Sequence, residues 1–447
     1  MKKVRETVVI LALILAWPWI SYSQEKMTLT LDECIRLALR QNPFYLSEKT
    51  KEEDAGYRVK EAISNFFPTL NAQGTNVLDK KVFTVELPSF IPGQPPQRYK
   101  IDFTRNYQFS LALSVPLFTG GRLISGLKQA NLNLAATQET IRQSRQETVF
   151  NVKKAFYGYL LAKKFVDVSE EALGLAEKHL KNVKNLYDVG MASKFDLLRS
   201  QVQAANLKPQ LIRAKNGLSL AELGLKNLLG LDLNQAVDIK GELNYQAFEA
   251  NLDANMAQAL VSRPELIQLN YQKQMAAEML KMARAASIPT LAVGGAYNYW
   301  SNEFNFKRNN WESYYAVNLV LSIPVFNGFS NSAKVGETKA MIKQLEYSRK
   351  GLMAVVKLEV QQAILNLQQA KESILSQEKN VEEAQEAVRI AELNYSEGLA
   401  TNLDVSAAQV ALSQAKTNYS QALYDYVTGL AQLEKAMGVG WDKDEVK

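Results

Sequence analysis

The sequence predicts an α+β membrane protein in which a β-barrel continues into long helical hairpins, built as an internal twofold repeat. Three matching motif pairs support this: Val-Pro-Leu-Phe-Thr-Gly at 115–120 and Ile-Pro-Val-Phe-Asn-Gly at 323–328, Tyr-Asp-Val-Gly at 187–190 and Tyr-Ser-Glu-Gly at 395–398, and Leu-Gly at 229–230 and Met-Gly at 437–438. Each pair is separated by 208 residues. A shift kept without a gap from strand end to chain end means two copies of one structural unit.

The repeat sets the expected domain boundaries. They are a signal peptide at 1–23, a first repeat at 24–231, a linker at 232–251, a second repeat at 252–440 and a C-terminal tail at 441–447. Upstream of the second strand of each copy the shift rises to 221 residues. The first copy therefore contains an insertion, which we place in the Pro-rich segment 88–97, because loops absorb insertions better than packed elements do.

The N-terminus has the features of an export signal. Three basic residues precede an apolar run at 8–20, and small residues precede a cleavage position before Gln24. The mature chain is therefore expected to be exported. No later stretch is long and apolar enough for a membrane-spanning helix, so a part within a membrane would have to be a β-barrel.

Composition argues against several functions. The charges that sum to +6 are dispersed, so no nucleic-acid partner is expected. The single cysteine, Cys34, excludes an intrachain disulfide framework. The single histidine, His179, lies between Lys178 and Lys181 and is expected on a solvated helix face. With no catalytic triad and no glycine-rich phosphate loop, we predict no enzymatic activity, no metal and no cofactor.

Helices are predicted both before and after the strands along the sequence. A short helix runs from Leu31 to Arg40, and a longer one follows Pro43 to about Asn65. After the strands, residues at alternating steps of three and four form a seam over 152–187, and again over 360–395. This is the heptad pattern of a coiled coil, and the return helices carry seams of their own over 197–225 and 405–433.

Each copy carries two predicted strands, at about 68–87 and 101–117 in the first copy and at about 289–305 and 311–325 in the second. From Ile101 to Leu117, apolar or aromatic residues fill every odd position except that of Arg105. Such period-two alternation is typical of a tilted strand that crosses a bilayer.

Proline and glycine mark the junctions between strands and helices. Pro116 and Pro324 cannot donate to a ladder, so each is expected to close its strand. Gly120 and Gly328 follow, and each is expected to let the backbone turn into the long helix.

The tips of the helical hairpins repeat as well. Gly190 and Gly398 are expected to cap the long helices. Ser193 and Thr401 then precede the return helices, each with an aspartate three residues later. Both segments resemble capping boxes, in which the acid sits at the third helical position.

Four strands in one chain cannot close a barrel, and open sheet edges do not survive in hydrocarbon. Two chains would give eight strands, whose interior fills with side chains, whereas three would give twelve and leave a lumen. We therefore expect a trimeric 12-stranded β-barrel, four strands per chain, continued by a long α-helical coiled-coil tunnel in the periplasm. Such a hollow object is an exit duct.

The two copies, their Val-Pro-Leu-Phe-Thr-Gly-Gly and Ile-Pro-Val-Phe-Asn-Gly-Phe junctions and their Tyr-x-x-Gly tips resemble the TolC family of outer-membrane efflux proteins. The resemblance implies a homotrimer among the lipids of a Gram-negative outer membrane, with a large periplasmic portion. It implies a periplasmic adaptor and an inner-membrane pump of the RND or ABC type, which export drugs, toxins or metals. A type I protein secretion duct and a non-transporting periplasmic coiled-coil scaffold are the alternatives; the scaffold leaves the alternating strands unexplained.

The same resemblance suggests roles for residues at the tips. Asp196 and Asp404 match acids that line the periplasmic entrance, and Tyr395 matches a tyrosine that helps to hold it shut; Tyr187 is its counterpart in the first copy. Two interpretations of the acids remain open: helix capping alone, or pore lining with or without capping. Six carboxylates in a trimer would favour cations and repel anions. The chain departs from the gate of some members at two positions, Ala400 and Ala407.

Overall fold

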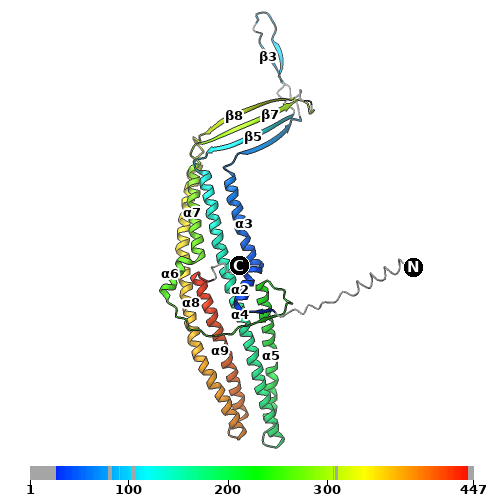
Figure 1. The fold of residues 1–447 in the computed structure, drawn as a ribbon, viewed down its shortest axis with the longest axis vertical. Helices are drawn as coiled ribbons and strands as arrows, with labels where there is room; N and C mark the ends of the chain where they lie inside the picture. The colour runs from blue at the N-terminus through cyan, green and yellow to red at the C-terminus, as the bar shows by residue number, and fades with distance from the viewer. Residues whose placement is uncertain are drawn as a thin grey trace, which may run out of the picture. The chain divides into compact units, whose positions relative to one another are not determined.

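The computed structural model describes residues 27–78, 83–89, 91–101, 107–305, 307 and 311–440, so the expected signal peptide and C-terminal tail lie outside the described residues (Figure 1). The described chain forms two compact units. The hairpin unit comprises Met1–Ser47, Ser144–Ala259 and Lys357–Lys447, and the strand unit comprises Glu48–Gln143 and Leu260–Val356.

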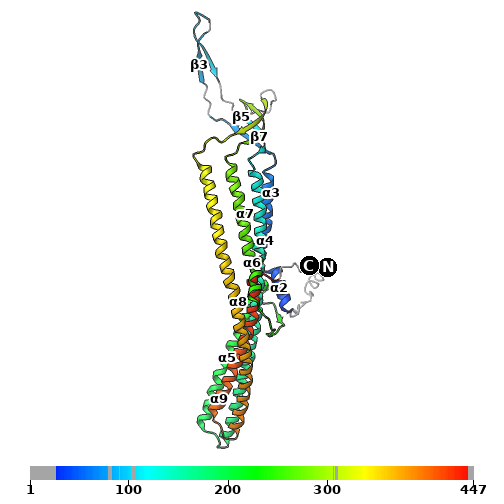
Figure 2. The same ribbon diagram turned by 90° about the vertical axis from the view of Figure 1, so that its left-hand side faces the viewer.

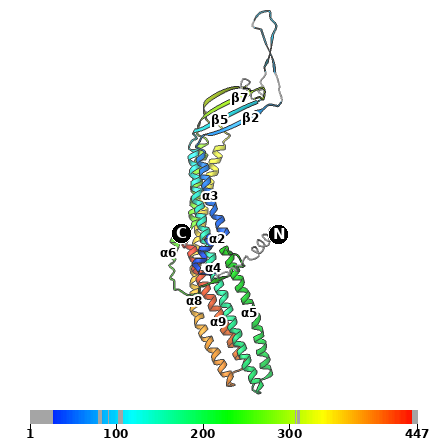
Figure 3. The ribbon, with the colours of Figure 1, turned by 45° about the vertical axis from the view of Figure 1, so that its right-hand side comes forward.

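The strand unit contains one four-stranded antiparallel sheet. Its strands are β2 (Thr69–Asn76), β5 (Tyr107–Phe118), β7 (Thr290–Ser301) and β8 (Glu312–Ser322), in the spatial order β2-β5-β7-β8 (Figure 3). Each copy of the repeat contributes two of these strands, as the sequence predicts. Within a single chain, each of the two edge strands has one neighbour: β2 pairs only with β5, and β8 pairs only with β7.

The register of the sheet gives it one apolar and one polar face, since residues paired directly across strands lie on the same face. Leu111 on β5 pairs with Tyr297 on β7, whereas the neighbouring Ser110 pairs with Asn298. The apolar face continues over Leu70, Leu113, Val293, Leu319 and Leu321. The sheet therefore has one side suited to lipid and one suited to water.

The insertion in the first copy is a second sheet rather than a plain loop. Strands β3 (Phe83–Leu87) and β4 (Gln97–Ile101) pair antiparallel as a separate hairpin (Figure 2). The predicted strands at 68–87 and 101–117 are therefore each divided between the two sheets. Period-two alternation is the same in either sheet, so it could not separate them.

Pro116 differs from its prediction. It lies inside β5, which continues to Phe118, and the pairing with β7 shifts register between these two residues. Such an irregularity accommodates a residue that lacks an amide hydrogen. Pro324, in contrast, follows the end of β8 at Ser322.

The helices show the repeat most plainly. Two short pairs are α2 (Leu31–Gln41) with α3 (Pro43–Ser64), and α6 (Leu252–Ser262) with α7 (Pro264–Ala285). The long helices α4 (Arg122–Asp188) and α8 (Ser330–Ser396) each have 67 residues, and both have residues in the two units. The return helices α5 (Lys194–Leu229) and α9 (Asn402–Met437) each have 36 residues. Among the described residues, no helix is long and apolar enough to cross a membrane.

The predicted seams form the core of the hairpin unit. On α8, five successive seam positions are almost inaccessible to solvent: Val360, Ala363, Leu367, Ala370 and Ile374. Burial of a side chain of this size contributes about 1.5–3 kcal/mol. Large and small residues alternate along this seam, which lets facing helices pack closely.

The expected linker at 232–251 carries a strand of its own. β6 (Val237–Ile239) pairs in parallel with β1 (Met27–Leu29). Further along, the Tyr426 hydroxyl donates to the carbonyl oxygen of Gln246 at 2.6 Å and accepts from the Phe248 amide at 3.1 Å. The linker is therefore held against the rest of the hairpin unit by the pairing of β6 with β1 and by the Tyr426 side chain.

Candidate functional site

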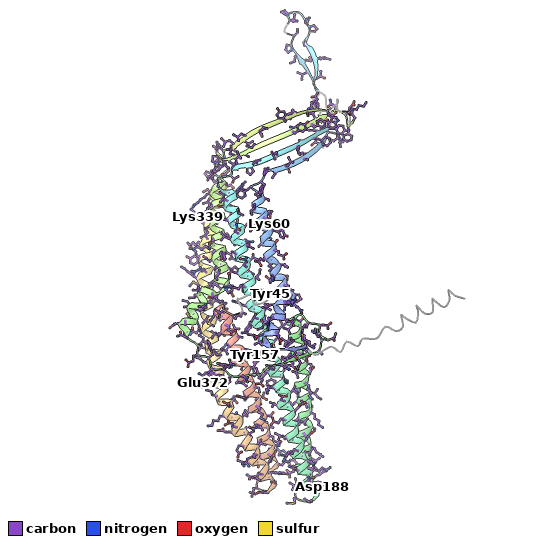
Figure 4. All side chains as sticks on the ribbon, in the orientation of Figure 1. Tyr45, Lys60, Tyr157, Asp188, Lys339 and Glu372 are labelled. Atoms are coloured by element: carbon purple, nitrogen blue, oxygen red, sulfur yellow. The ribbon has the colours of Figure 1, made fainter. Side chains whose placement is uncertain are left out.

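The two helical hairpins turn in the same way at their tips. Asp188 marks the end of α4, where the chain turns toward α5 (Figure 4). Gly190 and Gly398 both have left-handed backbones, with φ of 79° and 75°. Glycine adopts this conformation without the steric cost that a Cβ would add.

Both return helices begin with the predicted side-chain cap. The Ser193 hydroxyl accepts from the Asp196 amide at 3.1 Å and donates to the Asp196 carboxylate at 2.5 Å. Thr401 and Asp404 form the complete reciprocal box, in which the Thr401 amide also donates to the Asp404 carboxylate, at 2.8 Å. These contacts give both aspartates a capping role within one chain.

The capping box also stabilises the ionised form of Asp404. The hydroxyl and then the amide of Thr401 hydrogen-bond the carboxylate and lower its pKa. A hydrogen bond to the charged form of an acid stabilises that form. Asp404 is exposed at the tip, so its negative charge is available to solvent and to ions.

Tyr187 and Tyr395, equivalent in the repeat, have different surroundings. The Lys194 ammonium lies 5.3 Å from the centre of the Tyr187 ring. The Tyr395 ring meets the His179 imidazole edge-on, with 5.0 Å between ring centres. Burial, followed by the Asp196 carboxylate, raises the pKa of Tyr395, so its hydroxyl stays neutral at physiological pH.

The prediction for His179 is wrong, because the residue is buried, with only 7% of it exposed. Its Nε2 lies 2.8 Å from Oδ1 of Asn402, the first residue of α9. Adjacent helical positions point about 100° apart, so the flanking Lys178 and Lys181 do not define the face of His179. Its spacing from the seam, three residues after Ala176, was the sequence signal for burial.

A polar network therefore joins the two hairpins of one chain, and we call His179, Ser200 and Asn402 the hairpin bridge. The Asn402 side-chain amide donates to the Ser200 hydroxyl at 3.1 Å and to the Asp196 carbonyl oxygen at 2.9 Å. Asn402 and Ser200 are each only 4% exposed. Buried hydrogen bonds of this kind fix the relative position of the helices that they join.

Glycine provides a left-handed backbone at both junctions, and at the first junction it also leaves space for a neighbouring residue. Gly120 has φ of 62°, and a Cβ there would lie 2.9 Å from Cβ of Ile288. Gly328 has the same backbone conformation, with φ of 63°, but open space around it. Only the first junction therefore combines a left-handed turn with close packing.

The tips have charge and hydrogen-bonding groups but no visible site for metal chemistry. Within the part of the chain that the structure describes, no three His, Cys, Asp or Glu side chains come together in a geometry that could hold a metal ion. The exposed acids at the tips carry negative charge that ions in solution can reach.

The chain matches a family model described as outer membrane efflux protein, over residues 34–231 and 255–439. It is 24% identical over 336 residues to the outer membrane protein TolC of Vibrio cholerae, covering 71% of this chain and 72% of TolC. It is 26% identical over 350 residues to the alkaline protease secretion protein AprF of Pseudomonas aeruginosa, covering 75% and 70% of the two chains. Among solved structures, it is similar to the outer membrane protein VceC of Vibrio cholerae, with a TM-score of 0.75, 17% identity and coverage of 92% and 97%.

Proposed function

Because the chain belongs to the family of outer membrane efflux proteins, we propose that it is the exit duct through which small molecules such as drugs and toxins leave the cell. It is an outer-membrane channel protein with a large periplasmic part. The family forms trimeric channels that work with an adaptor and an inner-membrane pump. We extend this to a homotrimer that takes its cargo from a periplasmic adaptor and a pump of the RND or ABC type.

The four-stranded sheet carries the proposal. Its two faces differ, and both of its edge strands, β2 and β8, have unpaired backbone groups in a single chain. In hydrocarbon each unpaired group costs several kcal/mol. Three copies joined edge to edge would satisfy both edges, with the apolar faces toward lipid and the polar faces toward a lumen.

Planar bilayers test the proposed duct directly. The detergent-purified protein should insert as a trimer and conduct ions, and cross-linking in native membranes should stop at three chains. A protein that is recovered as a monomer without detergent and conducts nothing would support the periplasmic scaffold instead.

Protein secretion is the second candidate, because the similarity to AprF is as extensive as that to TolC. A deletion strain separates the two cargoes. Loss of tolerance to a panel of drugs and toxins, with an unchanged set of proteins in the medium, would support small molecules. Loss of one exported protein with unchanged tolerance would support secretion.

The hairpin formed by β3 and β4 should lie outside the cell and tolerate change. Gly93 lies in its turn, and a Cβ there would meet nothing within 4 Å. An epitope inserted beside Gly93 should be labelled on intact cells while trimers still assemble. The matched control is the same epitope beside Gly190, at a tip that we place in the periplasm, where labelling should require permeabilised cells. Labelling of both sites only after permeabilisation would contradict this topology.

A further inference from the structure

A cavity of about 640 Å³ lies between α4, α5 and α9 in the hairpin unit, apart from the caps and the hairpin bridge. Its lining residues come from positions 162–172, 203–217 and 409–417, so the cavity is formed within a single chain. Binding sites for small molecules commonly have volumes of about 300–1,000 Å³ and occur between the helices of bundles. The cavity therefore has the size and the setting of a ligand site.

Apolar and polar side chains both line this cavity. Phe165 and Val168 on α4 and Leu207 on α5 supply the apolar part. Gln210 on α5 and Ser413 on α9 are polar, and neither side chain hydrogen-bonds to another described residue. Binding sites of this kind hold a ligand through apolar contacts and fix its orientation through a few polar groups. A ligand that fits the cavity would therefore be amphipathic.

Among the lining residues, all of which the structure describes, Arg213 alone carries a charge. Its Nε donates to the Pro209 carbonyl oxygen at 3.4 Å, and its terminal nitrogens have no acceptor among the described residues. Guanidinium groups bind carboxylates in a planar, bidentate geometry. The unpaired end of Arg213 therefore favours an anionic ligand, and a carboxylate in particular.

The acids of α4 beside the cavity do not neutralise Arg213. Asp167 is exposed to solvent and does not line the cavity. Three other acids of α4 form ion pairs with lysines of the neighbouring helices: Glu170 with Lys215 at 2.8 Å, Glu171 with Lys416 at 2.6 Å and Glu177 with Lys208 at 3.7 Å. Exposed carboxylates act weakly at a distance, and pairing reduces their effect further. The charge of Arg213 therefore remains available to a ligand.

Gly217 leaves room beside Arg213. It lies four residues after Arg213 on α5, so the two positions share one face of the helix. A Cβ at Gly217 would meet nothing within 4 Å. In the second copy of the repeat, the counterparts of Arg213 and Gly217 are Gln421 and Asp425. The cation and the gap therefore occur together only in the first copy.

We propose that this cavity is a binding site for a small aromatic carboxylate. The carboxylate pairs with the guanidinium of Arg213 in the space beside Gly217, and the ring packs against Phe165 and Leu207. Contact between aromatic rings adds to the stabilisation from apolar burial. The site is complete in one chain, so the proposal goes beyond the export function and does not depend on which cargo passes through the duct.

Equilibrium dialysis tests the proposal, with naphthoate as the probe and naphthamide as its uncharged analogue. The detergent-purified protein should bind naphthoate about tenfold more tightly than naphthamide, because only the acid pairs with Arg213. Arg213→Gln should remove that preference and leave the binding of naphthamide unchanged. Arg199→Gln is the matched control, since it removes a cation from α5 outside the cavity. Detergent micelles are present in every sample, so the comparison between variants cancels the uptake of probe by micelles.

Filling the cavity gives a second test. Gly217→Leu places a side chain in the open space and should weaken the binding of both probes about tenfold. Leucine favours a helix more than glycine does, so this variant should fold at least as well as the parent. Gly224→Leu, two turns further along α5 and outside the cavity, should bind both probes like the parent.

The proposal would be overturned by equal affinity of the parent for both probes, by unchanged naphthoate binding in Arg213→Gln or Gly217→Leu, or by equal losses in the two controls. The export function is tested separately, by conductance in planar bilayers. A parent trimer that conducts ions but does not prefer naphthoate would therefore refute the ligand site and leave the proposed duct intact.

Discussion

Replacing Ile374 by aspartate is expected to destabilise the hairpin unit by about 3–5 kcal/mol per chain, the cost of an unpaired charge in a packed interior. Ile374 lies on the α8 seam and is only 2% exposed. An aspartate there would lose the packing of the isoleucine and would have no solvent for its carboxylate. The thermal midpoint of the detergent-solubilised trimer should fall sharply, or trimers should fail to assemble.

Gln377 lies three residues after Ile374 on the same seam, and its substitution provides the matched control. It is only partly buried, and its side chain accepts a hydrogen bond from Asn380 at 3.2 Å. Gln377→Leu should be tolerated, because leucine suits a seam position and the lost hydrogen bond is exposed to solvent. Trimers of Ile374→Asp that melt like the parent would show that this seam does not hold the hairpins together.

The long helices and their buried seams could be predicted from the sequence, because a repeat with a constant shift indicates duplicated elements and a heptad pattern indicates a packed helix face. The constant shift of 208 residues gave two long helices of equal length and two return helices of equal length. Heptad spacing placed Val360 and Ile374 in the core before any contact was known.

The insertion shows where periodicity stops being informative. Ile101 continues the alternation of the strand that follows it, yet it belongs to β4 and pairs with Phe83. Alternation reports that residues are extended, and it does not report which partner strand they choose. Five residues of β3 pair with five of β4 within the inserted region, and only the structure reveals this second sheet.

In the candidate site, contacts between residues close in sequence could be predicted, whereas contacts between distant residues could not. The caps at Ser193 and Thr401 are local in sequence, and both were predictable from the residue that follows three positions later. The hairpin bridge joins residues more than 200 positions apart. His179 could be recognised as buried only by its spacing from the seam, and its partner Asn402 had no local signal.

The acids at the tips cap their helices within one chain and, we propose, line a pore in the trimer. The double change Asp196→Asn with Asp404→Asn separates these roles. Asparagine keeps a side-chain oxygen that accepts from a backbone amide, so much of the capping survives. The charge is lost, so the preference for cations in planar bilayers and the block by multivalent cations should both weaken severalfold, with little change in thermal midpoint.

The dependence of the parent channel on pH gives an independent check. Thr401 lowers the pKa of Asp404 below its ordinary value of 3.8. A depressed pKa means that the charge, and its contribution to the cap, are present above the ordinary value and disappear only as the pH falls through the depressed one. The part of the cation preference that Asp404 contributes should therefore persist as the pH falls to the ordinary value of 3.8, and should be lost only at lower pH. A ring of six carboxylates cannot lose its charge without changing the ions that it attracts. If the double variant keeps the cation selectivity and the multivalent-cation block of the parent, both aspartates are therefore helix caps only.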